Sequence, residues 1–166
     1  MCIIDRLYLG LVFDRSSESI MIVASTEGGM SVEEIAKEKP DSIIRSKIEV
    51  AVGIQDFQAR ELAFGLGIEP ELVRRVSETI IGCAKAFSEL DATMVEVNPL
   101  VISKQKQILA LDCKMSFDNN AMFRRSQVSE LRDKTQEETK EVYASDRGLN
   151  YVSLDGNIGN IINGAG

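Results

Sequence analysis

The 166-residue chain contains no histidine, and this absence limits its chemistry more than any other feature of its composition. Without an imidazole, the chain cannot supply a histidine base, a histidine metal ligand or a phosphohistidine intermediate. Any reaction step that needs such a group must therefore take it from elsewhere.

Cysteine is also scarce, and the three residues Cys2, Cys83 and Cys113 lie far apart in the sequence. They form no Cys-x-x-Cys motif, which argues against a zinc site because histidine is missing as well. We therefore expect reduced thiols in a cytosol-like compartment.

Positive charge is in the minority, with 19 lysine and arginine residues, 26 acidic residues and a net charge of −7. Such a chain repels polyanions, so we expect no nucleic-acid partner. A single phosphate pocket is not excluded, since it needs only a metal ion and a few local donors. The apolar start is interrupted by Asp5 and Arg6, so we expect neither a signal peptide nor a membrane partner.

Hydrophobic periodicity predicts a mixture of strands and helices, with antiparallel hairpins at residues 6–24 and 93–115. Strands are expected over residues 6–14, 19–24, 43–50, 93–102, 107–115 and 149–154. Helices are expected from Ser31, capped with Glu34, to Pro40, and over residues 55–66, 70–90 and 127–145, with a loop or single turn at 118–125. The helical stripes predict core positions at Phe57, Leu62, Leu66, Val73 and Ile80.

Polar side chains interrupt the hairpin formed by residues 93–102 and 107–115. Residues two apart in a strand face the same side, so Glu96 and Asn98 should project together. Antiparallel pairing can bring Asp112 opposite them. Mg²⁺ binds a few protein oxygen atoms and completes its shell with water and phosphates. Asn98 and Asp112 can supply such oxygen atoms. The alternative is that all three are ordinary polar residues on a solvent-facing sheet surface.

Two further features allow more than one interpretation. Lys114 can form a cross-strand salt bridge or meet a phosphate. The glycine-rich turn at residues 163–166, which begins with Asn163, is either an anion-binding turn or a simple loop. An anion-binding glycine turn needs a following helix, and none follows here, so we expect a truncated chain.

Several short sequence stretches occur together in a fixed order, and they are more specific than the hydrophobic periodicity. They are LG at 9–10, DRS at 14–16, ASTEGG at 24–29, QARELA at 58–63, EVNPL at 96–100, LDCK at 111–114, NNAMFR at 119–124, LNYVSLDGNIG at 149–159 and NGAG at 163–166. This set resembles the β subunits of ADP-forming succinate–CoA ligases over essentially the whole chain.

The resemblance implies an ATP-grasp fold, in which two α+β subdomains clamp ATP, followed by a flavodoxin-like ligase domain. Residues 1–147 would form the second ATP-grasp subdomain, an α+β unit with a mainly antiparallel sheet and packed helices, with the first subdomain absent. Residues 148–166 would hold the first strand of a truncated ligase domain.

The resemblance also implies an activity, the ATP-dependent interconversion of succinate plus CoA and succinyl-CoA in the tricarboxylic acid cycle. A phosphohistidine of a partner α subunit would carry the phosphoryl group. Mg²⁺ and ATP, or GTP in its place, would be the cofactors, in the bacterial cytoplasm or the mitochondrial matrix. By matching motif, Asn98 and Asp112 resemble magnesium ligands, Glu96 the carboxylate that meets the phosphohistidine, and Asn163 a substrate contact.

Phosphoryl transfer depends on groups on several sides of the phosphate, so we expect half of a clamp to be inactive by itself and to hold nucleotide poorly. One alternative is a non-catalytic remnant or a module that only pairs with partner subunits. Another is the β subunit of a malate–CoA ligase or of another acid–thiol ligase. The residues of this chain do not decide between the acids, or between ATP and GTP.

Overall fold

The structure is a computed structural model that describes residues 2–132 and 134–164. The chain divides into two compact units, unit 1 (Met1–Arg125) and unit 2 (Ser126–Gly166). The predicted domain boundary between residues 147 and 148 stays a prediction. Among the described residues, no helix has the length and apolar character that a membrane crossing requires.

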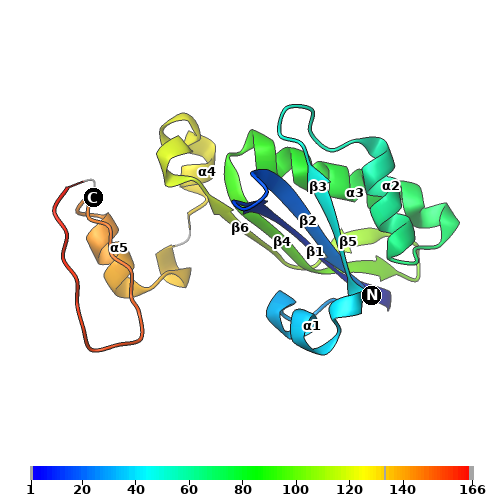
Figure 1. The fold of residues 1–166 in the computed structure, drawn as a ribbon, viewed down its shortest axis with the longest axis horizontal. Coiled ribbons are helices and arrows are strands. Elements are labelled where there is room, and N and C mark those ends of the chain that lie inside the picture. The colour runs from blue at the N-terminus through cyan, green and yellow to red at the C-terminus, as the bar shows by residue number, and fades with distance from the viewer. Residues whose placement is uncertain (1, 133, 165–166) are drawn as a thin grey trace. The chain divides into compact units, whose positions relative to one another are not determined.

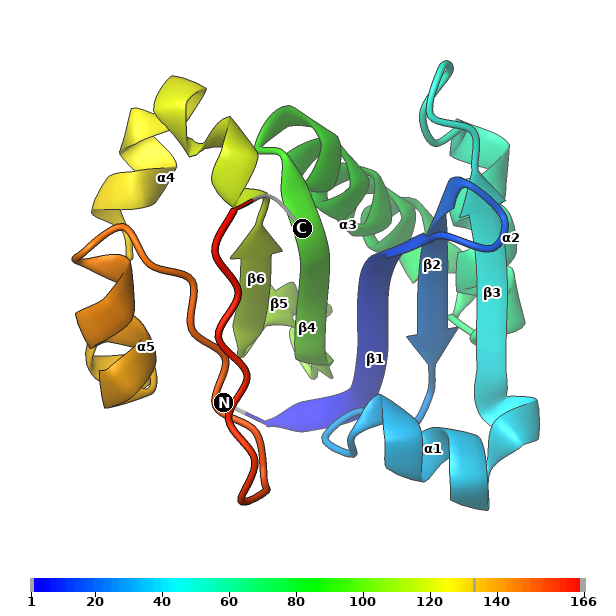
Figure 2. The same cartoon turned by 60° about the vertical axis from the view of Figure 1, so that its left-hand side comes forward.

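Unit 1 is built on a six-stranded sheet with the order β3-β2-β1-β4-β5, and β6 pairs with β4 as well. All pairs are antiparallel, which confirms the predicted sheet type, and Figure 2 looks onto this sheet. The strands are β1 (Ile3–Asp14), β2 (Ser19–Ser25), β3 (Ile43–Ile48), β4 (Ala92–Ser103), β5 (Ile108–Ala110) and β6 (Cys113–Phe117).

Helices α2 (Asp56–Gly65) and α3 (Pro70–Glu89) cover one face of the sheet (Figure 1). Alternate strand residues point toward these helices and form the core, where each large apolar side chain contributes about 1.5–3 kcal/mol. The predicted core positions Leu62, Leu66, Val73 and Ile80 are buried. Phe57 was predicted wrongly and is 61% exposed, because the buried face of α2 is formed by Ala59, Leu62 and Ala63.

The opposite face of the sheet, here called the open face, carries α1 (Val32–Glu38) at one end (Figure 2). The predicted capping box is confirmed, since Ser31 and Glu34 exchange hydrogen bonds at the start of α1. A short 3-10 helix, η1 (Pro40–Ser42), leads into β3. Tyr8 and Ile35 are buried outside the main core cluster. Tyr8 alternates with the core residues Leu7 and Leu9, so its ring lies on the open face.

The strand predicted over residues 107–115 is instead two short strands, β5 and β6, which both pair with β4. The break falls at Leu111 and Asp112, opposite Asn98 and Pro99. Pro99 has no N–H to donate to a ladder, so regular pairing stops there. Two bonds bridge the gap, from Leu111 N to Pro99 O at 3.1 Å and from Asn98 N to Asp112 O at 3.2 Å.

The segment after β6 is a 3-10 helix, η2 (Asn119–Arg124), as the predicted single turn suggests. It is tied to the start of β4 through Asp91, whose carboxylate accepts hydrogen bonds from the guanidinium groups of Arg124 and Arg125. These hydrogen bonds lower the pKa of Asp91 to about 2. All three cysteines are free, in agreement with the expected reduced thiols.

In unit 2, the helix predicted over residues 127–145 is divided into α4 (Ser126–Glu130), a 3-10 helix η3 (Lys134–Gln136) and α5 (Thr139–Ser145). A new helix starts because the Glu138 side chain accepts from the backbone N–H groups of Lys140 and Glu141. The strand predicted over residues 149–154 is wrong, since these residues are exposed and form no ladder with any described residue. A strand needs a neighbour to satisfy its backbone groups.

Candidate functional site

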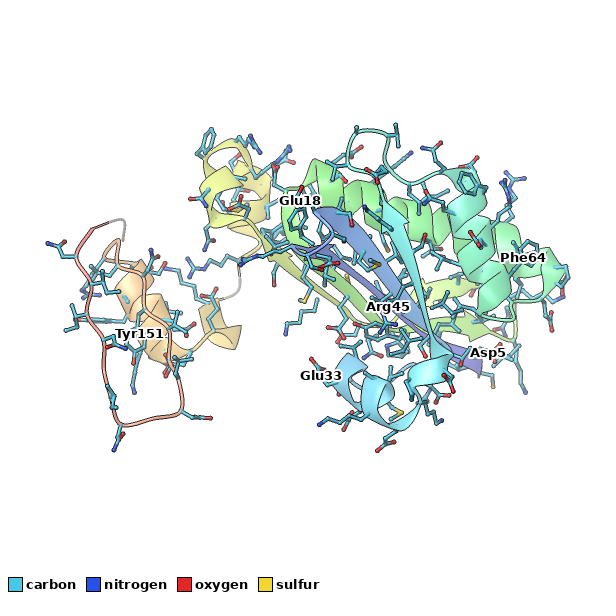
Figure 3. All side chains as sticks on the ribbon, in the orientation of Figure 1. Asp5, Glu18, Glu33, Arg45, Phe64 and Tyr151 are labelled. Atoms are coloured by element: carbon cyan, nitrogen blue, oxygen red, sulfur yellow. The ribbon has the colours of Figure 1, made fainter. Side chains whose placement is uncertain are left out.

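The open face carries a row of residues, one from each of five strands, that the sheet register aligns. Glu96 of β4 lies between Lys114 of β6 and Gly10 of β1. The row continues from Gly10 to Val23 of β2 and to Arg45 of β3, which Figure 3 labels. Adjacent strands are about 4.8 Å apart, so the row spans about 19 Å. A carboxylate thus lies in a row with a cation at each end.

Glu96 is half-buried on the open face, because its neighbours Val95 and Val97 point into the helix-covered core. Its cross-strand partner is Lys114, whereas the sequence predicted Asp112 opposite the stretch from Glu96 to Asn98. Asp112 meets only the Asn98 end of that stretch. Lys114 is exposed and forms no salt bridge with a described residue, so its predicted cross-strand ion pair is absent from that part of the chain.

Asn98 uses both ends of its side-chain amide to hold the turn that precedes α1. Its Oδ1 accepts a hydrogen bond from the Gly29 backbone N–H at 2.6 Å, and its Nδ2 donates to the Met30 carbonyl oxygen at 2.8 Å. The same turn contacts β1, where Gly28 N donates to Arg6 O at 3.1 Å. An amide oxygen has two lone pairs, so Oδ1 keeps one for a further ligand.

Asp112 lies at the β5–β6 break, and its side chain is exposed. Because its carbonyl oxygen accepts from the Asn98 backbone N–H, the two residues lie side by side on adjacent strands. The Asp112 carboxylate forms no hydrogen bond or ion pair within the described part of the chain. An exposed, unpaired carboxylate beside an amide oxygen can ligate a cation without first breaking an internal contact.

These oxygen donors fit a magnesium ion that keeps most of its shell for water and phosphate oxygens. They do not fit a closed protein cage, because no group of three or more histidine, cysteine, aspartate or glutamate residues that could hold a metal occurs among residues 2–132 and 134–164. Glu96 and Asn98 share the open face, and Asp112 lies beside Asn98 on the neighbouring strand. The metal role of Asn98 and Asp112 and the phosphohistidine-facing role of Glu96 stay predictions.

Tyr8 is a site residue that the sequence reasoning missed. Its side chain is 5% exposed, and its ring lies over Gly10, two residues along the same strand. Burial, together with the nearby carboxylates of Glu96 and Glu33, raises the pKa of Tyr8 to about 12. The phenol therefore stays protonated at neutral pH and can donate a hydrogen bond. The available signal was the Tyr-x-Gly spacing, since residues two apart in a strand share a face.

Asn163 lies in unit 2 and is exposed, without a described partner. Its substrate-contact role stays a prediction. Of the predicted glycine-rich turn at residues 163–166, the last two residues, Ala165 and Gly166, lie outside the described residues.

Comparison with known proteins decides the family. Residues 1–102 match the family model described as an ATP-grasp domain, and this range includes β1 to β3, α1 to α3, Glu96 and Asn98. The chain belongs to the ATP-grasp family. The α+β fold that the sequence implied is thereby confirmed. Asp112 lies outside the matched range, although it contacts the matched strand β4.

Relatives of this ATP-grasp chain include two kinds of ligase subunit. The chain is 56% identical over 164 residues to the probable malate–CoA ligase subunit beta of Mesorhizobium japonicum, covering 99% of this chain and 42% of that protein. It is 46% identical over 159 residues to the ADP-forming succinate–CoA ligase subunit beta of Bacillus subtilis, covering 96% and 41%. The chain thus spans about two fifths of the length of these relatives.

Solved structures agree with the ATP-grasp fold. ATP citrate lyase from Methanothrix soehngenii, in complex with citrate and coenzyme A, superposes with a TM-score of 0.64 at 20% identity and covers 88% of this chain and 33% of that one. The dinucleotide-forming acetyl-coenzyme A synthetase 1 of Ca. Korarchaeum cryptofilum gives a TM-score of 0.51 at 16% identity, covering 69% and 53%. At these identities the likeness concerns the fold alone.

Proposed function

We propose that this chain forms the metal- and phosphate-binding side of the β subunit of an acid–CoA ligase that acts on succinate. The observation that carries the proposal is the gathering of Glu96, Asn98 and Asp112 on the open face of an ATP-grasp sheet. Relatives named as succinate–CoA ligase subunits support it, since they match 96% to 99% of this chain.

Asn98 and Asp112 would hold Mg²⁺ through one amide oxygen and one carboxylate. When bound there, the ion would neutralise the charge of the nucleotide phosphates. The hydrogen bond from Gly29 N–H fixes the Asn98 amide, so its oxygen is oriented before any ligand arrives. Such preorganisation lowers the cost of ordering the site on binding.

Glu96 would accept a hydrogen bond from the imidazole N–H of a partner subunit's histidine. That contact fixes the tautomer and the orientation of an imidazole that receives a phosphoryl group. The absence of histidine from this chain is consistent with this division of labour, because the phosphoryl acceptor then comes from the α subunit.

Lys114 and Arg45 would contribute positive charge at the two ends of the row. Both are exposed, and neither forms an ion pair with a residue that the structure describes. Cations held on a sheet face stabilise phosphate oxygens without further rearrangement. ATP, or GTP in its place, would lie across this face, while Asn163 would contact the substrate. The bacterial origin of the named relatives supports a bacterial cytoplasm over a mitochondrial matrix.

A second acid is favoured by a specific observation. The malate–CoA ligase relative is 56% identical to this chain, against 46% for the succinate–CoA ligase of Bacillus subtilis. The trio on the open face handles phosphate and metal in either case, so it does not select the acid. Malate is therefore the alternative substrate.

The proposed function is tested with a hybrid subunit, in which the whole 166-residue chain replaces the matched segment of the Bacillus subtilis β subunit. The hybrid subunit is paired with the corresponding α subunit and given Mg²⁺ and ATP labelled at the γ-phosphate. We expect label on a histidine of the α subunit, because both sides of the clamp are then present. Adding CoA with succinate or with malate shows which acid discharges the label.

The control is the same hybrid subunit with Glu96→Gln, which keeps the size of the side chain and removes its charge. We expect it to bind the α subunit normally and to transfer far less label. A wild-type hybrid that assembles but transfers no label would support the non-catalytic pairing module instead. The 166-residue chain by itself, added to the α subunit, is expected to transfer none.

A further inference from the structure

The buried phenol of Tyr8 occupies the open face beside the proposed histidine-facing carboxylate. The side chain is 5% exposed, although it lies on the face of the sheet that the core helices do not cover. Its hydroxyl forms no hydrogen bond within residues 2–132 and 134–164, so its donor is available to a group beside it. The question is therefore which group this hydroxyl serves.

Gly10 has no side chain and so leaves room for the Tyr8 hydroxyl above this position of the row. A Cβ added at Gly10 would lie 2.7 Å from the Tyr8 hydroxyl oxygen and 3.1 and 3.2 Å from two ring carbons. The hydroxyl therefore fills the space that a side chain at position 10 would take. Gly10 is the direct register partner of Glu96, and residues paired in this way have Cα atoms about 4.5–5.5 Å apart. The hydroxyl thus lies over the β1 residue that pairs with Glu96, the β4 residue whose orientation matters most to the proposed reaction.

We propose that Tyr8 is a positioning residue for Glu96. When the imidazole of the α subunit approaches, the Glu96 carboxylate accepts a hydrogen bond from the free Tyr8 hydroxyl and is thereby held in one orientation. This inference rests on the proposed function, since it gives Glu96 a supporting partner for its contact with the imidazole of the α subunit. A glutamate side chain has several rotatable bonds, and beside its cross-strand neighbour Lys114 it can also turn toward that cation. The phenol selects one of these orientations.

The high pKa of Tyr8 is consistent with this arrangement, because burial and the carboxylate of Glu96 both disfavour the phenolate. Glu33, in the first turn of α1, is a second carboxylate that raises the same pKa and is therefore the competing acceptor. Substituting Glu96 and Glu33 separately distinguishes the two acceptors.

The test uses the hybrid ligase and measures kcat and KM for ATP in the phosphorylation of the α subunit. Tyr8→Phe keeps the ring and removes the hydroxyl; we expect kcat to fall about tenfold with KM for ATP unchanged. In a Glu96→Ala background, which has no acceptor oxygen, the same Tyr8→Phe change should lower kcat no further, because the hydroxyl acts only through the Glu96 carboxylate. If Tyr8 had only a structural role, Tyr8→Phe would lower kcat by the same factor in both backgrounds.

A second variant disturbs the same contact from Gly10, two residues along β1 from Tyr8. Gly10→Ala adds the Cβ that displaces the hydroxyl, so we expect a similar loss of kcat in a protein that still unfolds cooperatively. The matched control is Tyr143→Phe on α5, a 61% exposed tyrosine, for which we expect unchanged kcat and KM.

Each other outcome overturns the inference. Equal costs of Tyr8→Phe in both backgrounds, a rise in KM with constant kcat, or no loss at all would remove Glu96 as the partner. A tenfold loss of kcat in Glu33→Ala that is not additive with the loss in Tyr8→Phe would assign the hydroxyl to Glu33. An active wild-type hybrid with any of these results leaves the proposed function intact, whereas an inactive wild-type hybrid overturns both.

Discussion

Replacing Asp112 with alanine in the hybrid ligase is expected to lower Mg²⁺-dependent phosphorylation of the α subunit by about a hundredfold to a thousandfold. The carboxylate is exposed and has no partner among the described residues, so its removal disturbs no internal contact. The loss would therefore report on the metal and not on folding. The measurement is the rate of label transfer as a function of Mg²⁺ concentration.

Asp5→Ala is the matched control, because Asp5 is another exposed aspartate of the same sheet, at the start of β1. We expect its rate and magnesium dependence to equal those of the parent hybrid. If Asp112→Ala also keeps the parent rate with an unchanged magnesium dependence, Asp112 is not a metal ligand.

Gly28→Ala is expected to reduce the free energy of unfolding of the 166-residue chain by about 3 kcal/mol. The added Cβ would lie 2.6 Å from the Arg6 carbonyl carbon, from Leu7 N and from Leu7 O. These are backbone atoms of β1, which β2 and β4 hold on both sides, so they cannot move aside cheaply. Urea unfolding followed by circular dichroism gives the change in free energy.

Gly82→Ala provides a control with the same chemical change. Gly82 lies within α3, and a Cβ added there meets no atom within 4 Å. Alanine is the better helix former, so we expect this variant to gain about 0.5–1 kcal/mol. Equal effects of the two substitutions would show that the Gly28 turn does not press against β1.

The Gly28 variant also bears on the site, because the same turn carries the Gly29 N–H that donates to Asn98. Displacing the turn from β1 would release the Asn98 amide. Nucleotide binding in the hybrid should therefore weaken along with the stability of the chain.

Local signals in the sequence predicted much of the fold. The capping box of Ser31 and Glu34, and Pro70 at the first turn of α3, depend on residues a few positions apart. The β1–β2 hairpin likewise follows from alternation and a polar turn. These features were predicted correctly because the interactions that cause them lie within the segment itself.

The errors come from interactions between distant segments. The strand at residues 107–115 is broken because its partner strand contains Pro99, which no local pattern of residues 107–115 reveals. Phe57 was assigned to the core by spacing alone, although Ala59, Leu62 and Ala63 define a different buried face. Residues 149–154 have the composition of a strand but no described neighbour to pair with.

The candidate site, like the fold, was predictable where it depends on one strand or one hairpin. The period of a strand places Glu96 and Asn98 on one face, and the hairpin brings Asp112 beside Asn98. The row from Lys114 to Arg45 depends on the register of five strands, which the sequence does not determine. Tyr8 was missed for the same reason, since its importance follows from Gly10 lying opposite Glu96.

The corner formed by Asn98 and Asp112 is proposed to hold a divalent cation together with nucleotide phosphates. The most direct test replaces Mg²⁺ with paramagnetic Mn²⁺ and records the amide signals of the isotope-labelled 166-residue chain with excess ATP. Because paramagnetic broadening falls steeply with distance, it detects a metal even when binding is weak. We predict that the amide signals of residues 97–98 and 111–113 broaden first in the presence of ATP, and that Asp112→Ala removes the effect. Broadening spread evenly over the exposed acidic residues, or unchanged in Asp112→Ala, would contradict the account.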